Sequence, residues 1–430
     1  MKKKLALILA GLLCIGSFTS CAPSSPSSEK DAAKGAGNQP EMVIAVSENQ
    51  KEFYQVVISQ YRKLHPETDV TVEIIPWIDN TPTEKTEKNK KAIKDMQVQI
   101  MAGKGPDVFL LDESDSLLPD MVKSSYNGVF LDLNTVIDGI KGLPLNQTVV
   151  KAGEVDGKQY FLPLGYRLAG IAVADDTLGD FQPSSGQPDK FLKEVAAHAG
   201  VESFRNESLM KWYLPGLFGT PVLDYEEKSV TVSKELQDMA ELLEEGSGIT
   251  DENAPELPDV MTIGSSNDEG FAMLVKQSFA SGTDIKFLPF PNGEGGVNAQ
   301  VSIFAAVRAN SACASQAGEF LAFLLSDEMQ GSTGWEGFGN VMGPSAIPVN
   351  NNAVVPLFQY KFSLGAEEYQ EDAAKKAEEL SQLTQQVTTA RFCEYENSLI
   401  YQTVFMTDGS RPVAERLENL KDELRFYFEE

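Results

Sequence analysis

The sequence feature that most constrains the fold is the alternation of short apolar strands with amphipathic helices. Residues 42–47 have the sequence MVIAVS, a strand pattern, and the segment after them places apolar residues at helical spacing. Residues 69–76 alternate as a second strand, and residues 83–103 form a helix whose lysines and glutamates occupy one solvated face. Strands that alternate with helices build a sheet covered by helices, so the predicted fold class is α/β.

The segment that follows this helix is predicted to lead to a ligand-facing edge of the sheet. In MAGKGPDVFLLDES, Gly103 ends the helix in a left-handed turn and residues 107–111 are a buried strand. A phosphate-binding loop would need four residues between its glycines and a Lys-Ser/Thr pair after the second, and this segment has neither. Ligands of open parallel sheets bind beyond the carboxyl ends of the strands. The residues at those ends, which are predicted either to face the ligand or to be solvated turn residues, are Glu48, Asn49, Asp112 and Glu113.

The N-terminus has the layout of a bacterial secretion signal. Three lysines precede an apolar run that is too short to span a membrane comfortably, and small residues precede Cys21. Residues 18–21 resemble a lipobox, although phenylalanine stands where leucine is usual. We predict a signal peptide over 1–20, a lipidated Cys21 and a flexible tether over 21–40, which place the protein on the extracellular face of the bacterial cell membrane. The alternative is ordinary secretion with an unmodified cysteine.

Length and charge narrow the function classes. A chain of 430 residues is long enough for two lobes with separate cores. Its net charge of −27 argues against a nucleic acid or an anionic membrane surface as a partner, because both need a basic face. Only Cys313 and Cys393 remain in the predicted folded part. One disulfide is possible by count, but we expect the two thiols to lie in different lobes and to be free.

The rest of the chain continues the α/β pattern. Asp156-Gly157, between extended segments, indicates a hairpin turn. Strands are predicted over 258–264 and 300–307, and a helix with a regular apolar face follows the second of them. The last ~65 residues look wholly helical.

Five motifs, in their order and spacing, resemble one protein family. They are the Gly-x-Gly-Pro-Asp-Val entry to a strand at 103–108, the Asp-Gly-Lys-x-Tyr-x-x-Pro segment at 156–163, KFLPFPNGEGG at 286–296, QAGEFLAFLLSDEMQ at 316–330 and SRPVAERLENLKDELRFYF at 410–428. Together they resemble the extracellular solute-binding proteins of ABC importers, the family that includes the maltose-binding protein. The resemblance extends over about residues 41–430.

The resemblance implies a two-lobed periplasmic-binding-protein-like fold with hinge crossings and a helical C-terminal part. The N-terminal lobe would hold 41–164 and 292–335, and the C-terminal lobe 165–291 and 336–430. The implied function is a membrane-anchored monomeric receptor, without cofactor or metal, that captures a small solute between the lobes. It would deliver this solute, for which a carbohydrate is favoured, to ABC permease subunits.

The resemblance also implies solute-contacting residues, each with a structural alternative. Trp212 matches a stacking aromatic of the family, and its alternative is a core tryptophan. Arg167, at the first crossing, could bind the carboxylate of an acidic sugar or form a salt bridge between the lobes. Trp77 is expected to begin a helix cap or to pack beneath a helix. The remaining candidates at family positions are Tyr166, Tyr395 and Phe279, for which the alternative is core packing. Trp335 is expected to line the cleft because it lies near a predicted crossing.

Catalytic signatures are absent from the sequence. The two histidines, His65 and His198, are predicted to face solvent, and neither a G-x-S-x-G motif nor a zinc-ligand spacing occurs. We therefore predict that the protein is not an enzyme. One alternative is a secreted glycan hydrolase, because such an enzyme needs only two suitably placed carboxylates. Another is a binding module that serves a sensor.

Overall fold

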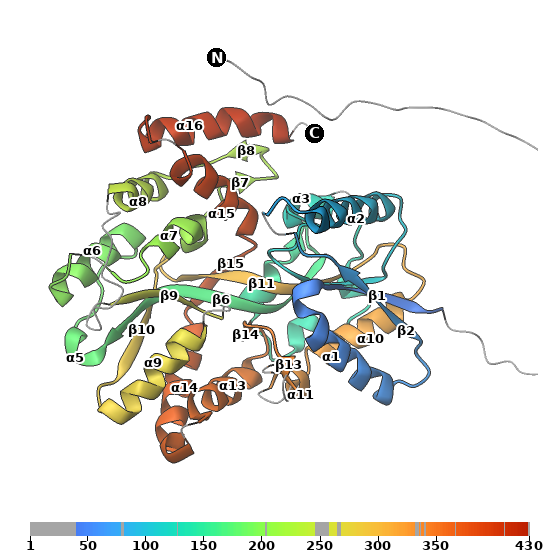
Figure 1. Ribbon diagram of the computed structural model, residues 1–430, viewed down its shortest axis with the longest axis horizontal. Coiled ribbons are helices and arrows are strands. Elements are labelled where there is room, and N and C mark those ends of the chain that lie inside the picture. The colour runs from blue at the N-terminus through green and yellow to red at the C-terminus, as the bar shows by residue number, and fades with distance from the viewer. Residues whose placement is uncertain are drawn as a thin grey trace, which may run out of the picture. The chain divides into compact units, whose positions relative to one another are not determined.

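A mixed nine-stranded sheet lies at the centre of the described part of the chain (Figure 1). The computed structural model describes residues 40–78, 81–126, 128–202, 204–245, 258–264, 268–331, 335, 337–338, 341–365, 367–407 and 409–428. The strands of the sheet are β1 Met42–Ser47, β2 Val70–Ile75, β3 Val108–Asp112, β6 Phe161–Ala174, β9 Asp259–Ile263, β10 Ile285–Pro289, β11 Val297–Val307, β14 Ile347–Pro348 and β15 Val387–Arg391. Neighbours follow the order β10-β6-β11-β3-β1-β2, with β9 and β14 beside β6 and β15 beside β11.

Helices lie on both faces of this sheet (Figure 1). They are α1 Lys51–Leu64, α2 Glu84–Met101, α3 Met121–Tyr126, α4 Gln147–Lys151, α5 Asp175–Leu178, α6 Pro188–Ala199, α7 Ser208–Tyr213, α8 Lys234–Glu245, α9 Asp268–Ser281, α10 Ala314–Leu324, α11 Asp327–Gln330, α13 Asn351–Ser363, α14 Gln370–Thr384, α15 Glu394–Ile400 and α16 Val413–Leu424. Short strand pairs are β4 Glu154–Val155 with β5 Lys158–Gln159, β7 Leu223–Asp224 with β8 Ser229–Val230, and β12 Gly337–Phe338 with β13 Val341–Met342. This arrangement confirms the predicted α/β class.

The first three strands confirm the α/β units predicted from the sequence. β1 pairs in parallel with both β2 and β3, and α1 buries an apolar face that includes Val57 and Tyr61. α2 begins at the N-cap Thr83, whose side chain accepts a hydrogen bond from the backbone N–H of Thr86. Gly103 follows α2 with a φ of 69°, the left-handed turn that its position predicted. The parallel pairing places the carboxyl ends of all three strands at one edge.

Two long strands, β6 and β11, change partners along their length. The first part of β6 pairs with β11, and its second part pairs with β9 and β10. Residues 303–307 of β11 pair with β3, whereas residues 297–300 pair in parallel with β15. Both strands therefore have different neighbouring strands at their two ends. β6 has β11 at one end and β9 and β10 at the other, and β11 has β3 at one end and β15 at the other. The sequence predicted an extended segment after Asp156-Gly157 and a crossing at Arg167, and the structure joins these residues in the single strand β6.

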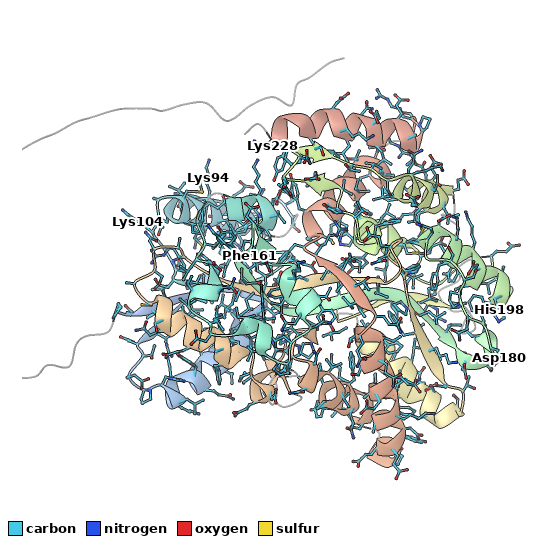
Figure 2. The ribbon with its side chains drawn as sticks, turned by 180° about the vertical axis from the view of Figure 1, so that it is seen from behind. Lys94, Lys104, Phe161, Asp180, His198 and Lys228 are labelled. Atoms are coloured by element: carbon cyan, nitrogen blue, oxygen red, sulfur yellow. The ribbon has the colours of Figure 1, made fainter. Side chains whose placement is uncertain are left out.

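Two clusters of buried apolar side chains hold the sheet and helices together. The larger one joins β1, β3 and β11 to α13 and α14, and the smaller one joins the second part of β6 to α6, α8 and α16. Phe161, at the start of β6, lies in the interior, whereas His198 lies at the periphery and is exposed, as predicted (Figure 2). Because the larger cluster includes Phe271 and Leu380 as well as Ile44, it extends across the boundaries predicted for the lobes, which stay a prediction.

The C-terminal part differs from its prediction in one element. It is mostly helical, but β15 interrupts it, so the prediction of a wholly helical end was wrong. Val387, Thr388 and Thr389 are β-branched residues, which favour a strand, and the edge of β11 offers them backbone partners. The prediction of two free thiols is confirmed, since Cys313 and Cys393 are both buried and unbridged.

The hairpin predicted at Asp156-Gly157 is present between β4 and β5. Both turn residues have positive φ values, 51° and 74°, as the favoured two-residue hairpin turn requires. Gly153 precedes this hairpin, and its carbonyl accepts hydrogen bonds from the backbone N–H groups of Tyr160 and Phe161. A Cβ atom at Gly153 would lie 1.9 Å from the carbonyl oxygen of Phe161. The absence of a side chain is therefore what allows this close approach.

Replacing Gly153 with alanine should lower the free energy of unfolding by about 1–3 kcal/mol, because backbone atoms must shift to admit the methyl group. Urea unfolding followed by circular dichroism would measure this loss. Gly142→Ala is the matched control, since nothing lies within 4 Å of a Cβ there. A loss for Gly153→Ala no larger than that of the control would contradict the close contact.

Residues 1–39 contain the predicted signal peptide, Cys21 and nearly all of the predicted tether, and they lie outside the described residues. Among the residues that are described, no helix is both long enough and apolar enough to cross a bilayer.

Candidate functional site

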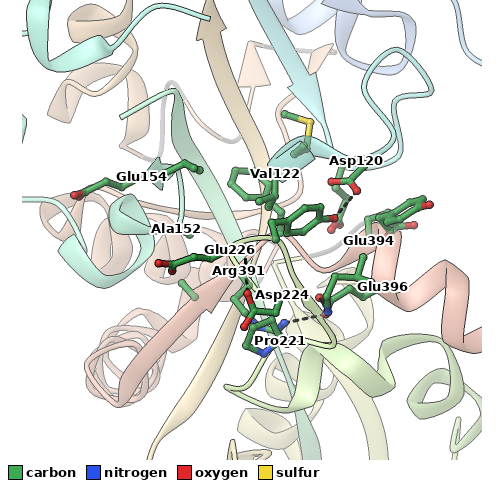
Figure 3. A pocket seen from close by; sticks show the side chains of 18 of the residues that line it. Asp120, Val122, Ala152, Glu154, Pro221, Asp224, Glu226, Arg391, Glu394 and Glu396 are labelled. Atoms are coloured by element: carbon green, nitrogen blue, oxygen red, sulfur yellow. Dashed lines mark hydrogen bonds and ion pairs between the residues drawn. The ribbon is translucent and has the colours of Figure 1, made fainter. Parts of the chain in front are cut away.

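A cavity of about 370 Å³ lies beyond the carboxyl end of β3 (Figure 3). Glu113, the first residue after β3, lines it together with residues from the segments 119–122, 152–156, 221–226 and 390–396. β3 pairs with the end of β11, whereas β15, which leads into 390–396, pairs with its beginning. The cavity is therefore lined by side chains from two parts of the sheet, the part around β3 and the part around β15.

Two of the lining carboxylates, Glu113 and Glu394, converge on the side chain of Arg167. One Nη atom of Arg167 forms an ion pair with Glu113, and the other lies 3.6 Å from Glu394 Oε2 and donates a hydrogen bond of 3.3 Å to Gln300 Oε1. The guanidinium carbon also lies 4.5 Å from the centre of the Tyr213 ring. Arg167 thus forms ion pairs with residues that are distant in the chain, and its predicted roles at the solute or between the lobes stay predictions.

Burial controls the protonation of the two glutamates, Glu113 and Glu394, that surround Arg167. The side chains of Glu113 and Arg167 are only 8% and 9% exposed. Burial raises the pKa of the Glu113 carboxyl to about 8, against the opposing charge of Arg167, and it also raises the pKa of Glu394. Glu113 Oε2, Arg167 Nε and Gln300 Nε2 are buried and have no hydrogen-bond partner within the described part of the chain. Buried polar atoms are normally paired, so this cluster has spare bonding capacity.

The one basic residue among the cavity-lining residues, Arg391, binds other groups of the protein through both Nη atoms, while its buried Nε has no hydrogen-bond partner among the described residues. It donates hydrogen bonds to Glu396 Oε2 at 2.8 Å and to the carbonyl oxygens of Pro215 and Phe218 at 2.9 and 2.8 Å. Glu396 also accepts hydrogen bonds from two backbone N–H groups next to β7. This pair fixes the segment 390–396 against the turn before β7, and it leaves the charge of Arg391 balanced.

Aromatic side chains gather around Asp120, which lines the cavity. The hydroxyls of Tyr225 and Tyr427 both donate to Asp120 Oδ2, and burial together with this carboxylate raises the pKa of both tyrosines. Lys123 Nζ lies 3.7 Å from the centre of the Tyr427 ring, and Tyr395 stacks on the same ring at 5.5 Å. These contacts join α3 to segments more than a hundred residues away along the chain.

Some of the residues predicted from the sequence are brought together here. Glu113 and Tyr395 line the cavity, and Arg167 lies behind Glu113. Asp112 does not line it, because its carboxylate accepts hydrogen bonds from the Ser47 hydroxyl and the backbone N–H of Ser114.

The other candidates at the strand ends lie apart from this cavity. Glu48 accepts a hydrogen bond of 2.9 Å from the backbone N–H of Trp77 and lies 3.7 Å from Lys85 Nζ. Asn49 is exposed. Trp77 is 43% exposed and the N-cap of α2 is Thr83, so the expectation that Trp77 begins a helix cap or packs beneath a helix was wrong.

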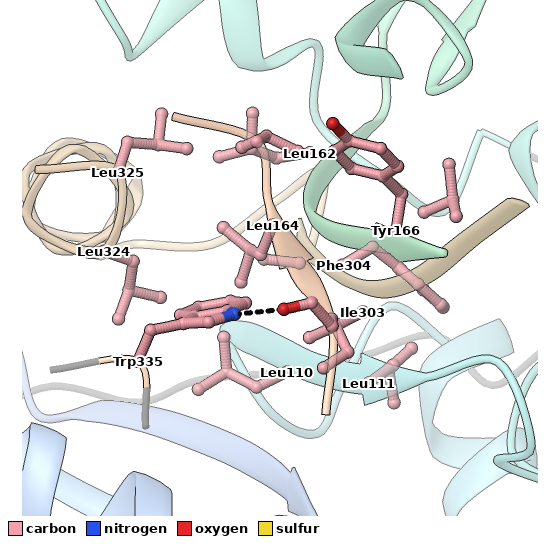
Figure 4. Close-up of a cluster of buried hydrophobic side chains, with 14 of the residues drawn as sticks. Leu110, Leu111, Leu162, Leu164, Tyr166, Ile303, Phe304, Leu324, Leu325 and Trp335 are labelled. Atoms are coloured by element: carbon pink, nitrogen blue, oxygen red, sulfur yellow. Dashed lines mark hydrogen bonds between the residues drawn. The ribbon is translucent and has the colours of Figure 1, made fainter. Parts of the chain in front are cut away.

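The remaining aromatic candidates pack within the protein. Trp212 is partly buried and meets the Tyr401 ring edge-on at 5.2 Å. Phe279 packs against Tyr369. Tyr166 and Trp335 are buried in the larger apolar cluster, which removes both from the surface of the cavity (Figure 4).

Sequence reasoning missed several residues of the site. Tyr213 and Glu394 each adjoin a residue that was predicted, so one step along the chain would have found them. Asp120, Tyr225 and Tyr427 carried no local signal, because they meet only after the chain folds.

Comparison with known proteins identifies the fold. No family model and no curated protein matches the chain. An extracellular solute-binding protein of family 1 from Alicyclobacillus acidocaldarius matches with a TM-score of 0.55 and 12% identity, over 92% of this chain and 100% of that one. A cyclic alpha-maltosyl-1,6-maltose binding protein from Arthrobacter globiformis matches with a TM-score of 0.56 and 12% identity, over 90% and 99%. A periplasmic oligogalacturonide binding protein from Yersinia enterocolitica matches with 0.58 and 14%, over 91% and 99%.

The chain therefore has the two-lobed α/β fold of these solute-binding proteins. Structures of de novo designed esterases match it as well. Since one fold can serve binding or catalysis, the fold alone does not establish the function, which depends on the residues of the site.

Proposed function

We propose that this protein is a receptor that captures a small carbohydrate in the cavity beyond β3 and delivers it to an ABC permease. In this proposal the lipidated Cys21 holds it at the extracellular face of the membrane. The observation that supports the proposal most directly is the lining of the cavity. Glu113 follows β3 and Glu394 follows β15, and these two strands pair with opposite ends of β11. A solute bound between Glu113 and Glu394 would hold the β3 part and the β15 part of the sheet together.

The proposed lobes, 41–164 with 292–335 and 165–291 with 336–430, would move about β6 and β11. Strands that cross between lobes act as hinges in proteins that close around a ligand. Asp120 lies in the first proposed lobe, and both tyrosines that bind it lie in the second. This contact stabilises a closed arrangement, and a solute in the cavity would add to it. The ring of Tyr395 offers a flat apolar surface for a sugar ring.

A receptor of this kind should be stabilised by its solute without consuming it. Thermal unfolding in a panel of mono- and disaccharides should show one class that raises the free energy of unfolding by about 2.7 kcal/mol at a hundredfold excess over Kd. Tyr395→Ala should weaken binding of that saccharide about tenfold, or ~1.4 kcal/mol, because it removes the proposed stacking surface. Tyr360→Ala is the control, since Tyr360 is 42% exposed on α13 and away from the cavity. If no saccharide raised the melting temperature, the carbohydrate-receptor proposal would fail.

The second candidate function is glycan hydrolysis, and one observation favours it. Glu113 has a pKa raised to about 8, as a general acid requires, and Glu394 is a second carboxylate in the same cavity. A hydrolase would release product from a bound oligosaccharide over time, and Glu394→Gln would stop this release. Chromatography of the saccharide after prolonged incubation separates the two functions, because a receptor returns it unchanged.

A further inference from the structure

We infer that the solute bound in this cavity is cationic, an amine-bearing saccharide rather than a neutral or acidic one. This inference rests on the proposed function and adds the chemical class of the solute. Its physical basis is the distribution of charge around the cavity and the spare bonding capacity of one buried carboxylate.

The cavity is strongly acidic. Eight of its twenty lining residues are aspartate or glutamate, they come from every lining segment, and one is arginine. That arginine, Arg391, is balanced by Glu396 and so offers no free positive charge to a solute. The acidity is not uniform over the protein, because the hollow lined by Arg411, Arg416 and their neighbours contains no carboxylate. Carboxylates gathered around one concave site concentrate cations there and repel anions.

A buried carboxylate oxygen in this lining lacks a partner. Glu113 Oε1 pairs with Arg167, but Glu113 Oε2 has no hydrogen-bond donor among the residues that the structure describes. The side chain is 8% exposed, so bulk water satisfies this oxygen poorly. Glu113 and Glu394 together share the single positive charge of Arg167. An ammonium group that donates to Glu113 Oε2 would satisfy the oxygen and balance the second carboxylate.

The protonation of the pair agrees with this arrangement. Burial raises the pKa of both Glu113 and Glu394, which means that a second negative charge is unfavourable there without an added cation. A cationic group placed between them would favour the charged form of both.

An amine fits this lining better than a metal ion. Among the described residues, no three or more His, Cys, Asp or Glu side chains converge as metal ligands. The carboxylates are instead spread around a cavity of about 370 Å³, a volume in the range of small-molecule sites. Tyr395 supplies an aromatic face in the same cavity for the body of a saccharide.

The test compares three disaccharides of equal size that differ in charge: the disaccharide of glucosamine, cellobiose and digalacturonate. Calorimetric titrations at about pH 6.5, where sugar amines are largely protonated, would be run in roughly 20 mM and 200 mM salt. The glucosamine disaccharide should bind at least about tenfold more tightly than cellobiose in low salt, and this advantage should shrink in high salt. Digalacturonate should bind least.

Two neighbouring glutamates provide a matched pair of variants. Glu226 lines the cavity, whereas Glu227, the next residue of the same exposed turn, does not. Glu226→Gln should reduce the preference for the glucosamine disaccharide about two- to threefold, and Glu227→Gln should leave it unchanged.

The outcomes separate this inference from the proposed function. If cellobiose or digalacturonate bound as tightly as the amine, or if both glutamine variants behaved alike, the cationic preference would be overturned while the receptor proposal stood. If none of these or other saccharides bound, the receptor proposal itself would fall.

Discussion

Replacing Arg167 with methionine is expected to lower the free energy of unfolding by about 3–5 kcal/mol, because it leaves Glu113 and Glu394 buried without their shared cation. The exposed pair of Arg411 with Glu415 provides the control, and Arg411→Met should cost less than about 1 kcal/mol. The double variant Arg167→Met with Glu113→Gln should recover part of the loss. Urea unfolding of the three variants beside the wild type measures each of these values.

The loss in Arg167→Met should depend on pH in a defined direction. The pKa of Glu113 is raised by burial from 4.5 to about 8 in the folded protein, so its stabilising contribution is complete below about pH 4.5 and is lost as the pH rises through 8. Removing the guanidinium raises this pKa further. The difference in the free energy of unfolding between the variant and the wild type should therefore be small near pH 5 and larger at about pH 8.5. Equal losses at both pH values would contradict the ion-pair network.

Replacing Trp335 with alanine is expected to destabilise the protein by about 3–5 kcal/mol, through the cavity left in the larger apolar cluster. The Trp335 side chain is 3% exposed, its Nε1 donates a hydrogen bond of 2.8 Å to the carbonyl oxygen of Ala346, and its ring meets Phe53 edge-on (Figure 4). Thermal and urea unfolding would measure the loss.

Trp77→Ala is the matched control for this experiment, because Trp77 is 43% exposed. It should change the free energy of unfolding by less than about 0.5 kcal/mol. Solute affinity measured on the folded fraction of Trp335→Ala should equal that of the wild type. A mild effect on stability with a large loss of affinity would instead place Trp335 at the solute, as its position near a predicted crossing first indicated.

Much of the fold could be predicted because its signals are local. The apolar run at 42–47 forms β1 over the same residues, and the turn at Asp156-Gly157 has the backbone conformation that its residue types favour. β6 was harder to predict as one strand. Pro163 and Gly165 are poor strand residues, yet both are accommodated because the neighbouring strands β11 and β14 fix the backbone from either side.

The candidate site could be predicted only in part, because its contacts form between residues far apart in the chain. The position of Glu113 after a buried strand was sufficient to place it at the edge of the sheet where the cavity lies. The same reasoning also selected Asp112, whose carboxylate is occupied by Ser47 and Ser114. Whether a polar side chain faces a cavity or a hydrogen-bond partner depends on residues that are distant in the chain.

Periodicity, helix caps and turn residues act between residues a few positions apart, so most helices and strands and the α/β class could be predicted from the chain, whereas β15 and the continuity of β6 could not. The balance of Arg167 by Glu113 and Glu394, the burial of Trp335 and the contact of Asp120 with Tyr427 became visible only in the folded chain. Burial and charge pairing arise from contacts between segments far apart in the chain, and these same contacts set the acidity of the cavity.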